Sequence, residues 1–215
     1  MTDFRQEFIA FAVARGVIGF GQFKTKAGRL SPYFFNAGLF NDGASLSKLC
    51  GYYAQAIASA GLPFDMLFGP AYKGIVLAGG VAMSLLAGHN QNRPFAFNRK
   101  EAKDHGEGGT IIGAPLQGKV MIIDDVISAG ISVRESVELI RNEGAQLAAV
   151  VIALDRMERG LTSELSAVQE VERDFGIPVI SVATLADLVA FLNIQPNLKS
   201  ELTAVMTYRQ QYGIR

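Results

Sequence analysis

The sequence contains few of the residues from which disulfides and protein-bound zinc sites are built. Among its 215 residues there are one cysteine, two histidines and no tryptophan. The single cysteine, Cys50, excludes an internal disulfide, and with only two histidines beside it the chain cannot furnish an ordinary structural zinc site. A reducing compartment, the cytoplasm, is therefore expected.

The sequence also lacks an excess of charge and a long apolar run. Lys plus Arg and Asp plus Glu both total 20, so the basic surface of a general nucleic-acid binder is not expected. The longest uninterrupted apolar stretch, residues 147–154, is far too short to cross a bilayer. The amino terminus carries Asp3, Arg5 and Glu7 where a signal peptide needs apolar residues. We therefore expect neither a membrane nor a nucleic acid among its partners.

The composition indicates a packed globular chain. Hydrophobic residues make up 49% and charged residues 19% of the sequence, a balance typical of a protein with a full core. No repeat, low-complexity tract or interdomain linker interrupts residues 1–215. A single domain over the whole chain is therefore expected.

Helix-like and strand-like spacings of apolar residues alternate along the chain. Helices are expected over residues 3–15, 42–60, 75–86, 133–143, 164–175 and 198–212, and another is opened by the capping pattern of residues 184–187. Strands are expected over residues 20–25, 33–36, 66–68, 95–97, 120–123, 147–154 and 179–182. Apolar strands alternating with helices indicate an α/β fold, in which a mostly parallel central sheet is flanked by helices.

Two segments fall outside this alternation. Residues 26–32 form a turn between the two aromatic-rich strands near the amino terminus, and this turn is predicted to expose Lys26 and Arg29. Residues 99–115 lack any periodicity, so an unstructured loop is expected there. Long loops of this kind inside compact domains are usually functional or mobile.

Residues 120–132, VMIIDDVISAGIS, combine three features of a ligand site. An apolar strand ends in Asp124 and Asp125, and the carboxyl ends of buried parallel strands are where such sheets bind ligands. The small-residue turn 128–132 then brings backbone N–H groups to the start of a helix, an arrangement that binds phosphate. An isolated acid pair would more often cap a turn, but the combination favours a functional site.

This segment resembles the ribose-phosphate-binding motif of type I phosphoribosyltransferases. The resemblance implies that Asp124 and Asp125 hold the ribose 2- and 3-hydroxyls of 5-phosphoribosyl 1-pyrophosphate (PRPP), and that the turn binds its 5′-phosphate. It also implies the fold of that family, with a small N-terminal hood near residues 1–40 and a mobile lid near residues 99–115. The residues of the motif that follow the acids are Val126, Ile127, Ser128, Ala129, Gly130, Ile131 and Ser132.

The turn departs from the family pattern at two positions. A threonine usually stands where this chain has Ser128, and another where it has Ile131. One hydroxyl donor to phosphate is therefore expected to be lost, with Ser132 a candidate to replace it. Because backbone N–H groups do most of the anion binding in such a turn, weakened or rearranged phosphate contacts are expected, not lost function.

Over nearly its full length the sequence resembles the orotate branch of this family. After Lys26, the stretch GRLSPYFF at residues 28–35 is similar to an N-terminal loop in which the lysine and the aromatic pair, here Phe34 and Phe35, line the base and pyrophosphate site. On general grounds the stretch is equally well a hairpin whose aromatic rings simply pack.

Residues 69–74, GPAYKG, resemble the pyrophosphate-binding loop of the orotate branch. The glycines let the backbone approach a ligand closely, while Lys73 supplies a charge-assisted donor beside Tyr72. The alternative is an ordinary strand-to-helix turn with a solvated lysine.

Arg156 follows the strand that ends at residue 154, so it stands at the carboxyl edge of the sheet. A guanidinium there is able to bind a planar carboxylate, such as that of orotate, through two parallel hydrogen bonds. The resemblance assigns Arg156 this role, together with Lys26, Phe34, Phe35 and Ser128 at the base. An arginine paired with Asp155 or with solvent is the alternative.

Arg99, Lys100, Lys103 and His105 lie in the aperiodic segment among several glycines. Taken alone, such a mixed charge run is more often a solvated surface. The same order of residues occurs in orotate phosphoribosyltransferases, where this loop closes over pyrophosphate and reaches into the partner subunit's site. The resemblance thus implies a homodimer with shared active sites, in which these cations offset the charge of pyrophosphate and Lys103 or His105 delivers a proton.

The reaction implied by the resemblance is transfer of the phosphoribosyl group of PRPP to orotate, giving orotidine 5′-monophosphate and pyrophosphate for UMP biosynthesis. Asp124, Asp125, Lys103 and His105 would be catalytic, and Mg²⁺ would be held mainly by substrate oxygens near the two acids. Two rivals keep the acid-pair motif. One is a phosphoribosyltransferase for uracil or a purine base, and the other is a non-catalytic regulator that binds nucleic acid or nucleotides. A dinucleotide-binding oxidoreductase is disfavoured because no Gly-x-Gly-x-x-Gly follows an opening strand.

Overall fold

The structure is a computed structural model that describes residues 3–25, 27–103, 109–128 and 130–214, with the side chains of 102, 103 and 109 left aside. In chain order its elements are α1 (Phe4–Ala14), β1 (Ile18–Lys24), β2 (Leu30–Phe35), η1 (Ala37–Leu39), α2 (Gly43–Ala60), β3 (Met66–Gly69), α3 (Lys73–His89), β4 (Phe95–Lys103), β5 (Gly109–Gly113), β6 (Lys119–Ile123), α4 (Ile131–Asn142), β7 (Gln146–Asp155), α5 (Ala167–Phe175), β8 (Val179–Thr184), α6 (Leu185–Asn193), η2 (Pro196–Leu198) and α7 (Lys199–Tyr212).

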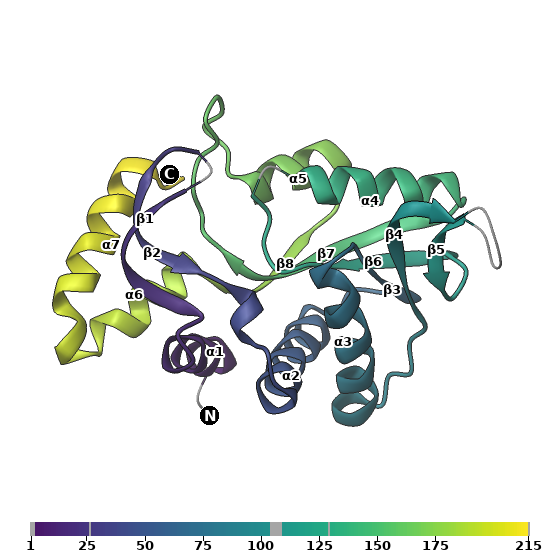
Figure 1. The fold of residues 1–215 in the computed structure, drawn as a ribbon, viewed down its shortest axis with the longest axis horizontal. Helices are drawn as coiled ribbons and strands as arrows, with labels where there is room; N and C mark the ends of the chain where they lie inside the picture. The colour runs from purple at the N-terminus through teal and green to yellow at the C-terminus, as the bar shows by residue number, and fades with distance from the viewer. Residues whose placement is uncertain (1–2, 26, 104–108, 129, 215) are drawn as a thin grey trace.

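The predicted α/β fold with a mostly parallel sheet is confirmed. Six strands form one sheet in the order β5-β4-β3-β6-β7-β8, and every pair is parallel except β4 with β5. Helices α4 and α5 cover one face of this sheet, and α2 and α3 cover the other (Figure 1). Among the helices of the described residues, none is both long enough and apolar enough to cross a bilayer.

The central strands are buried on both faces, which explains why they read as continuous apolar runs. Along β6, Met121 and Ile123 pack in a core with α2 and α3, whereas Val120 and Ile122 pack in a second core with α4 and α5. Successive side chains of a strand point to opposite faces, so one short segment fastens both helical layers to the sheet. The acid pair that follows is therefore carried on a strand that is packed on both faces.

Near the amino terminus, β1 and β2 form a separate two-stranded antiparallel sheet that lies beside α7 (Figure 1). A lone two-stranded sheet is marginal in water, so it needs packing partners. Tyr33 of β2 is fully buried and meets Tyr208 of α7 edge-on, with 6.5 Å between ring centroids. The hood thus depends on a helix that is distant in the sequence, since Tyr208 lies 175 residues after Tyr33.

The prediction that the hood turn exposes Arg29 is wrong. Its side chain is only 13% exposed, because Nη1 donates to the carbonyl of Arg159 (2.8 Å) and Nη2 to the carbonyl of Gly160 (3.0 Å). Its guanidinium also lies over the ring of Tyr212. These partners come from distant parts of the chain, so local composition gave no sign of them. Lys26 lies outside the described residues.

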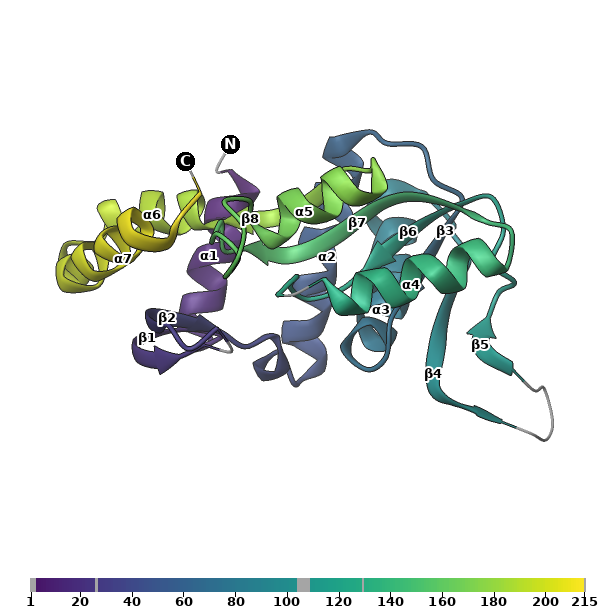
Figure 2. The same ribbon diagram turned by 90° about the horizontal axis from the view of Figure 1, so that it is seen from above.

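The prediction of an unstructured loop at residues 99–115 is also wrong for much of this segment. β4 continues to Lys103 and pairs antiparallel with β5, with Phe97 opposite Ile112 and Asn98 opposite Ile111. Figure 2 shows this hairpin extending away from the body of the protein. A hairpin at the edge of a sheet buries little apolar surface. Its strands therefore carry charged residues and lack the apolar pattern by which a strand is recognised in a sequence. Residues 104–108 lie outside the described part.

Candidate active site

The two carboxylates stand at the carboxyl edge of the sheet, as predicted. The backbone N–H of Asp124 donates to the carbonyl of Val151 (3.0 Å), and Ala153 donates to the carbonyl of Asp125 (2.9 Å). From α2, the buried hydroxyl of Tyr53 donates to the Asp124 carbonyl at 2.7 Å. β7 therefore holds the backbone of both acids, and α2 also holds that of Asp124.

Tertiary folding joins the acid pair to the loop at residues 69–74. Lys73 Nζ donates to Asp125 Oδ2 at 2.6 Å, and Ser132 Oγ donates to Asp124 Oδ2 at 3.1 Å. Burial raises the pKa of Asp124 to about 6, and the neighbouring Asp125 adds to the rise. Hydrogen bonds from the Asp125 N–H and from Ser132, with the charge of Lys73, oppose it. The charged form of Asp124 therefore lowers the free energy of unfolding.

We expect Asp124→Asn to stabilise the fold while damaging the site. Because the pKa of Asp124 is raised in the folded state, its contribution to stability is complete below the unfolded pKa of 3.8 and is lost as pH rises through about 6. Asparagine removes the charge, which is worth about 3 kcal/mol at neutral pH, but it keeps only one of the two acceptor oxygens that the Asp125 N–H and Ser132 use. With about 1 kcal/mol lost at that hydrogen bond, the free energy of unfolding should rise by about 2 kcal/mol at neutral pH.

Urea denaturation at pH 7.5 and at pH 4.5 measures this gain, which should largely vanish at the lower pH. Glu135→Gln, at an exposed position of α4, is the control, and it should show no such pH-dependent gain. An Asp124→Asn protein that is no more stable than the wild type at pH 7.5 would contradict the assignment.

The turn after the acids presents the start of α4. Gly130 is in the left-handed region (φ 68°), and no side chain of the described residues caps this helix. The N–H groups there are free for an anion. Ile131 is 63% exposed, whereas Ser132, expected as a phosphate donor, gives its hydroxyl hydrogen to Asp124. An anion bound at this turn would therefore be held mainly by backbone N–H groups.

The other residues of the motif serve the turn in different ways. Val126 packs against the core on the α2 side, and Ile127 packs against the core on the α4 side, so these two anchor the loop. Ser128 is exposed, in keeping with a substrate contact, and Ala129 lies outside the described residues.

In the loop at residues 69–74, two glycines let neighbouring backbone segments pack closely against each other. A Cβ at Gly69 would overlap the carbonyl of Gly74, and a Cβ at Gly74 would lie 2.8 Å from the carbonyl of Ile123. The side chain of Asn98, within β4, accepts from the N–H of Ala71 at 2.8 Å. Asn98 was not predicted as a site residue, although a polar residue directly after the predicted strand 95–97 is a usable signal.

Of the four predicted cations, Lys100 lies near this loop, Arg99 precedes it on β4, and two cannot be placed. Tyr72 is 70% exposed, and Lys100 Nζ lies 5.2 Å from the centre of its ring. Arg99 precedes Lys100 on β4, so the hairpin carries positive charge next to the loop. His105 and the side chain of Lys103 lie outside the described part of the chain.

On the base side, the aromatic pair packs within the hood. The rings of Phe34 and Phe23 are 4.6 Å apart, and the Phe34 ring lies against Gly19, where a Cβ would collide with it. Phe35 packs against the core on the α2 side. The packing alternative for these rings therefore holds in part, because both help to build the hood.

Arg156 does not pair with Asp155, the protein partner weighed for it from the sequence, and its side chain is 23% exposed. Its Nε donates to Glu158 Oε1 at 2.8 Å and its Nη2 to Ser31 Oγ at 3.0 Å. The guanidinium carbon lies 4.3 Å from the centre of the Tyr33 ring. The side chain thus bridges β7 and the hood at the same sheet edge as the acids. Glu158 and Ser31 were missed, although an acid two residues after an arginine is a local signal.

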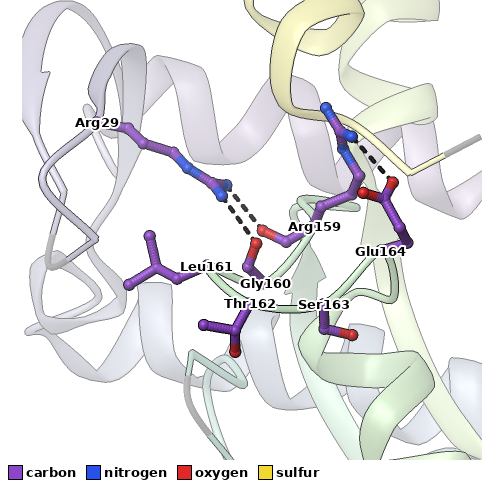
Figure 3. Close-up of a pocket in the computed structure, with 7 residues that line it drawn as sticks. All are labelled: Arg29, Arg159, Gly160, Leu161, Thr162, Ser163 and Glu164. Carbon is purple, nitrogen blue, oxygen red and sulfur yellow. Dashed lines mark hydrogen bonds and ion pairs between the residues drawn. The ribbon is translucent and has the colours of Figure 1, made fainter.

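A pocket of about 300 Å³ lies between the hood turn and the segment after β7. Figure 3 shows Arg29 reaching from the turn to the carbonyls of Arg159 and Gly160, with Arg159 paired to Glu164 beside them. Its lining, Arg29 and residues 159–164, includes none of the predicted site residues. The pocket is therefore a junction between the hood and the body of the protein, separate from the acid pair.

The oxygen atoms of the two acids suit a hard cation that takes most of its ligands from substrate and water. Among the described residues, no three His, Cys, Asp or Glu side chains gather closely enough to hold a metal. Asp124 and Asp125 offer oxygen atoms, the ligands that Mg²⁺ prefers, but Lys73 already takes one of them. Any Mg²⁺ there would need oxygen atoms from substrate and water.

Fold and site together define a phosphoribosyltransferase. A parallel sheet carries two acids at its carboxyl edge, followed by an uncapped helix start suited to phosphate. Residues 39–183, more than half of the chain, match the family model described as phosphoribosyl transferase domain.

Relatives at high sequence identity show to which branch of the phosphoribosyltransferases the chain belongs. Orotate phosphoribosyltransferase of Laribacter hongkongensis (strain HLHK9) is 66% identical over 215 residues, covering 100% of both chains. That of Chromobacterium violaceum is 64% identical over 214 residues, covering 100% of this chain and 99% of the relative. A crystal structure of orotate phosphoribosyltransferase from Francisella tularensis matches with a TM-score of 0.88 and 40% identity, over 96% of this chain and 99% of that one. The chain belongs to the orotate phosphoribosyltransferase family.

Proposed function

We propose that this orotate phosphoribosyltransferase joins orotate to PRPP at the carboxyl edge of β6 and β7. The bond between ribose C1 and pyrophosphate breaks, a bond forms from C1 to a ring nitrogen of orotate, and that nitrogen loses its proton. The products are pyrophosphate and orotidine 5′-monophosphate, an intermediate of pyrimidine biosynthesis. The observation that carries this proposal is the Lys73–Asp125 ion pair, which unites the pyrophosphate loop with the acid pair.

The chain contributes mainly positioning and electrostatics, because the sugar becomes cation-like as pyrophosphate leaves. Asp124 and Asp125 would hold the ribose hydroxyls and place negative charge beside that cation. Lys73, which pairs with Asp125 in the free protein, would turn to the pyrophosphate when the substrate binds. The N–H groups at the start of α4 would hold the 5′-phosphate.

The remaining charge on pyrophosphate would be offset by Tyr72 and the cations of the hairpin. By family resemblance these are Arg99, Lys100, Lys103 and His105, with Lys103 or His105 as the proton donor. Mg²⁺, held mainly by substrate oxygens near Asp124 and Asp125, would further neutralise the departing group.

The base would lie between the hood and the end of β7. Arg156 would donate to the orotate carboxylate, which disfavours uracil and purine bases because they lack that group. Lys26, Phe34, Phe35 and Ser128 would line the rest of the base site. A nucleic-acid-binding regulator is disfavoured by the formal net charge of +0.

We further propose a homodimer in which each hairpin completes the partner's site. Val76, Met83 and Leu86 are 54%, 74% and 51% exposed along one stripe of α3, and Phe95, 38% exposed, lies beside them at the start of β4. Contiguous exposed apolar residues of this kind support a protein interface. The 215 residues would form one domain with a hood near 1–40 and a lid near 99–115, acting in the cytoplasm without membrane or nucleic-acid partners.

The test is loss of orotate absorbance with purified protein, PRPP and Mg²⁺. We expect turnover that requires all of the components, with uracil and hypoxanthine tested in parallel. Turnover of either base without turnover of orotate would overturn the substrate assignment. A flat trace from folded protein that binds RNA or DNA in a salt-dependent way would favour the regulator.

A further inference from the structure

The carboxylate of Glu158 lies at the centre of a polar cluster that joins the base side of the site to the hood and α7. Its Oε1 accepts from Arg156, with 2.8 Å to Nε and 2.6 Å to Nη2. Its Oε2 accepts from the hydroxyl of Tyr208 at 3.2 Å and lies 4.0 Å from Arg29 Nη1. The side chain is 16% exposed, so these contacts are shielded from water.

The contacts of Arg156 determine which of its N–H groups stay available. A guanidinium has five N–H donors in a fixed plane. The Nε hydrogen and one Nη2 hydrogen face Glu158, and the other Nη2 hydrogen faces Ser31. Tyr33 covers one face of the plane. Among the described residues, no acceptor bonds to Nη1, so its two hydrogens are left for a ligand.

The backbone around Glu158 is fixed by the carboxyl-terminal segment. Met157 adopts a left-handed conformation (φ 52°), its N–H donates to Asp155 Oδ1 at 2.8 Å, and its carbonyl accepts from Ile214 at 2.9 Å. Glu158 itself forms an antiparallel bridge with Gly213. Glu158 therefore has a defined place from which to direct Arg156.

We propose that Glu158 is a positioning residue that orients Arg156 toward the carboxylate of the base, and so sets the preference for a carboxylated pyrimidine. This inference rests on the proposed function, in which Arg156 binds that carboxylate. Without Glu158, the guanidinium would be free to rotate about its long side chain and would lose the bonds that fix its plane. Tyr208 and Arg29 support Glu158 in turn, which links α7 and the hood turn to base recognition.

The test is a double-mutant cycle on the full-length protein with Glu158→Ala, Arg156→Ala and both together. Losing a hydrogen bond to a charged group typically weakens binding about tenfold or more. Glu158→Ala should therefore raise the KM for orotate by at least about tenfold. The KM for PRPP should stay within about twofold by the same scale. In the Arg156→Ala background, the second substitution should add almost nothing.

Three further measurements separate positioning from a general loss of structure. Glu158→Gln, which keeps an acceptor for Nε, should recover part of the orotate affinity. Inhibition by uracil, which lacks the carboxylate, should be unchanged in every variant. Glu164→Gln is the matched control, because Glu164 pairs with Arg159 on the same segment and does not contact Arg156 (Figure 3).

The outcomes also separate this inference from the proposed function. An unchanged orotate KM in Glu158→Ala, additive effects with Arg156→Ala, or an equal rise in both substrate KM values would overturn the positioning role alone. A wild-type protein that does not turn over orotate would overturn the proposed function, and the positioning role with it.

Discussion

Replacing Asp125 with asparagine is expected to lower kcat/KM for PRPP by about a hundredfold or more. The carboxylate is only 7% exposed, and in the free protein it holds Lys73 at 2.6 Å. Asparagine keeps the shape but removes the negative charge that would face the cation-like sugar, and it weakens the hold on Lys73. Initial rates from orotate absorbance, with PRPP varied at fixed orotate, measure the loss.

Glu135→Gln is a suitable control, because Glu135 is an exposed acid on α4, the helix that follows the phosphate turn. It should leave kcat/KM within about twofold, since surface substitutions away from special features have small effects. If Asp125→Asn retained nearly full activity, the acid pair would have no direct part in the reaction, and the ribose would have to lie elsewhere.

Replacing Lys103 with alanine should lower kcat by about a hundredfold or more, the usual size of a lost acid–base group. The expectation comes from the family resemblance together with the place of Lys103 at the end of β4, on a hairpin that extends from the body of the protein (Figure 2). The KM for orotate should change little, because the base is bound by the hood and Arg156.

Mixing the two inactive variants tests whether sites are shared between subunits. If Lys103 acts in the partner's site, a dimer of one Asp125→Asn and one Lys103→Ala subunit has one site with both defects and one intact site. Random mixing makes half of the dimers mixed, so activity should return to about a quarter of the wild-type value. Two differently tagged variants show whether mixed dimers have formed. Activity that stays at the level of the parents in such dimers would place Lys103 in its own subunit's site.

Much of the fold was predictable because its central strands are buried on both faces. The apolar runs at 120–123 and 147–154 have no polar interruption, and helix caps flank the segments between strands. Boundaries were less certain. α5 begins at Ala167, later than the predicted residue 164, because Ser166 caps it through a hydrogen bond from the Gln169 N–H.

The edge hairpin of β4 and β5 could not be predicted from the pattern of apolar residues. β4 and β5 were predicted as loop beyond residue 97, because an edge hairpin has little apolar surface to bury and carries the charges of Arg99 and Lys100. The pairing that makes it a hairpin, Ala96 with Gly113 and Asn98 with Ile111, is a property of two segments together. Neither segment alone reveals it.

The sequence by itself determined the α/β class, the acid pair at the end of an apolar strand, the small-residue turn before a helix and the family, because these depend on contiguous residues. The tertiary structure alone decided which side chains face one another. It brought Lys73 to Asp125, Ser132 to Asp124, and Glu158 and Ser31 to Arg156. Buried polar groups need partners, but most of these partners lie far apart in the chain, and only the folded sheet sets which of them meet.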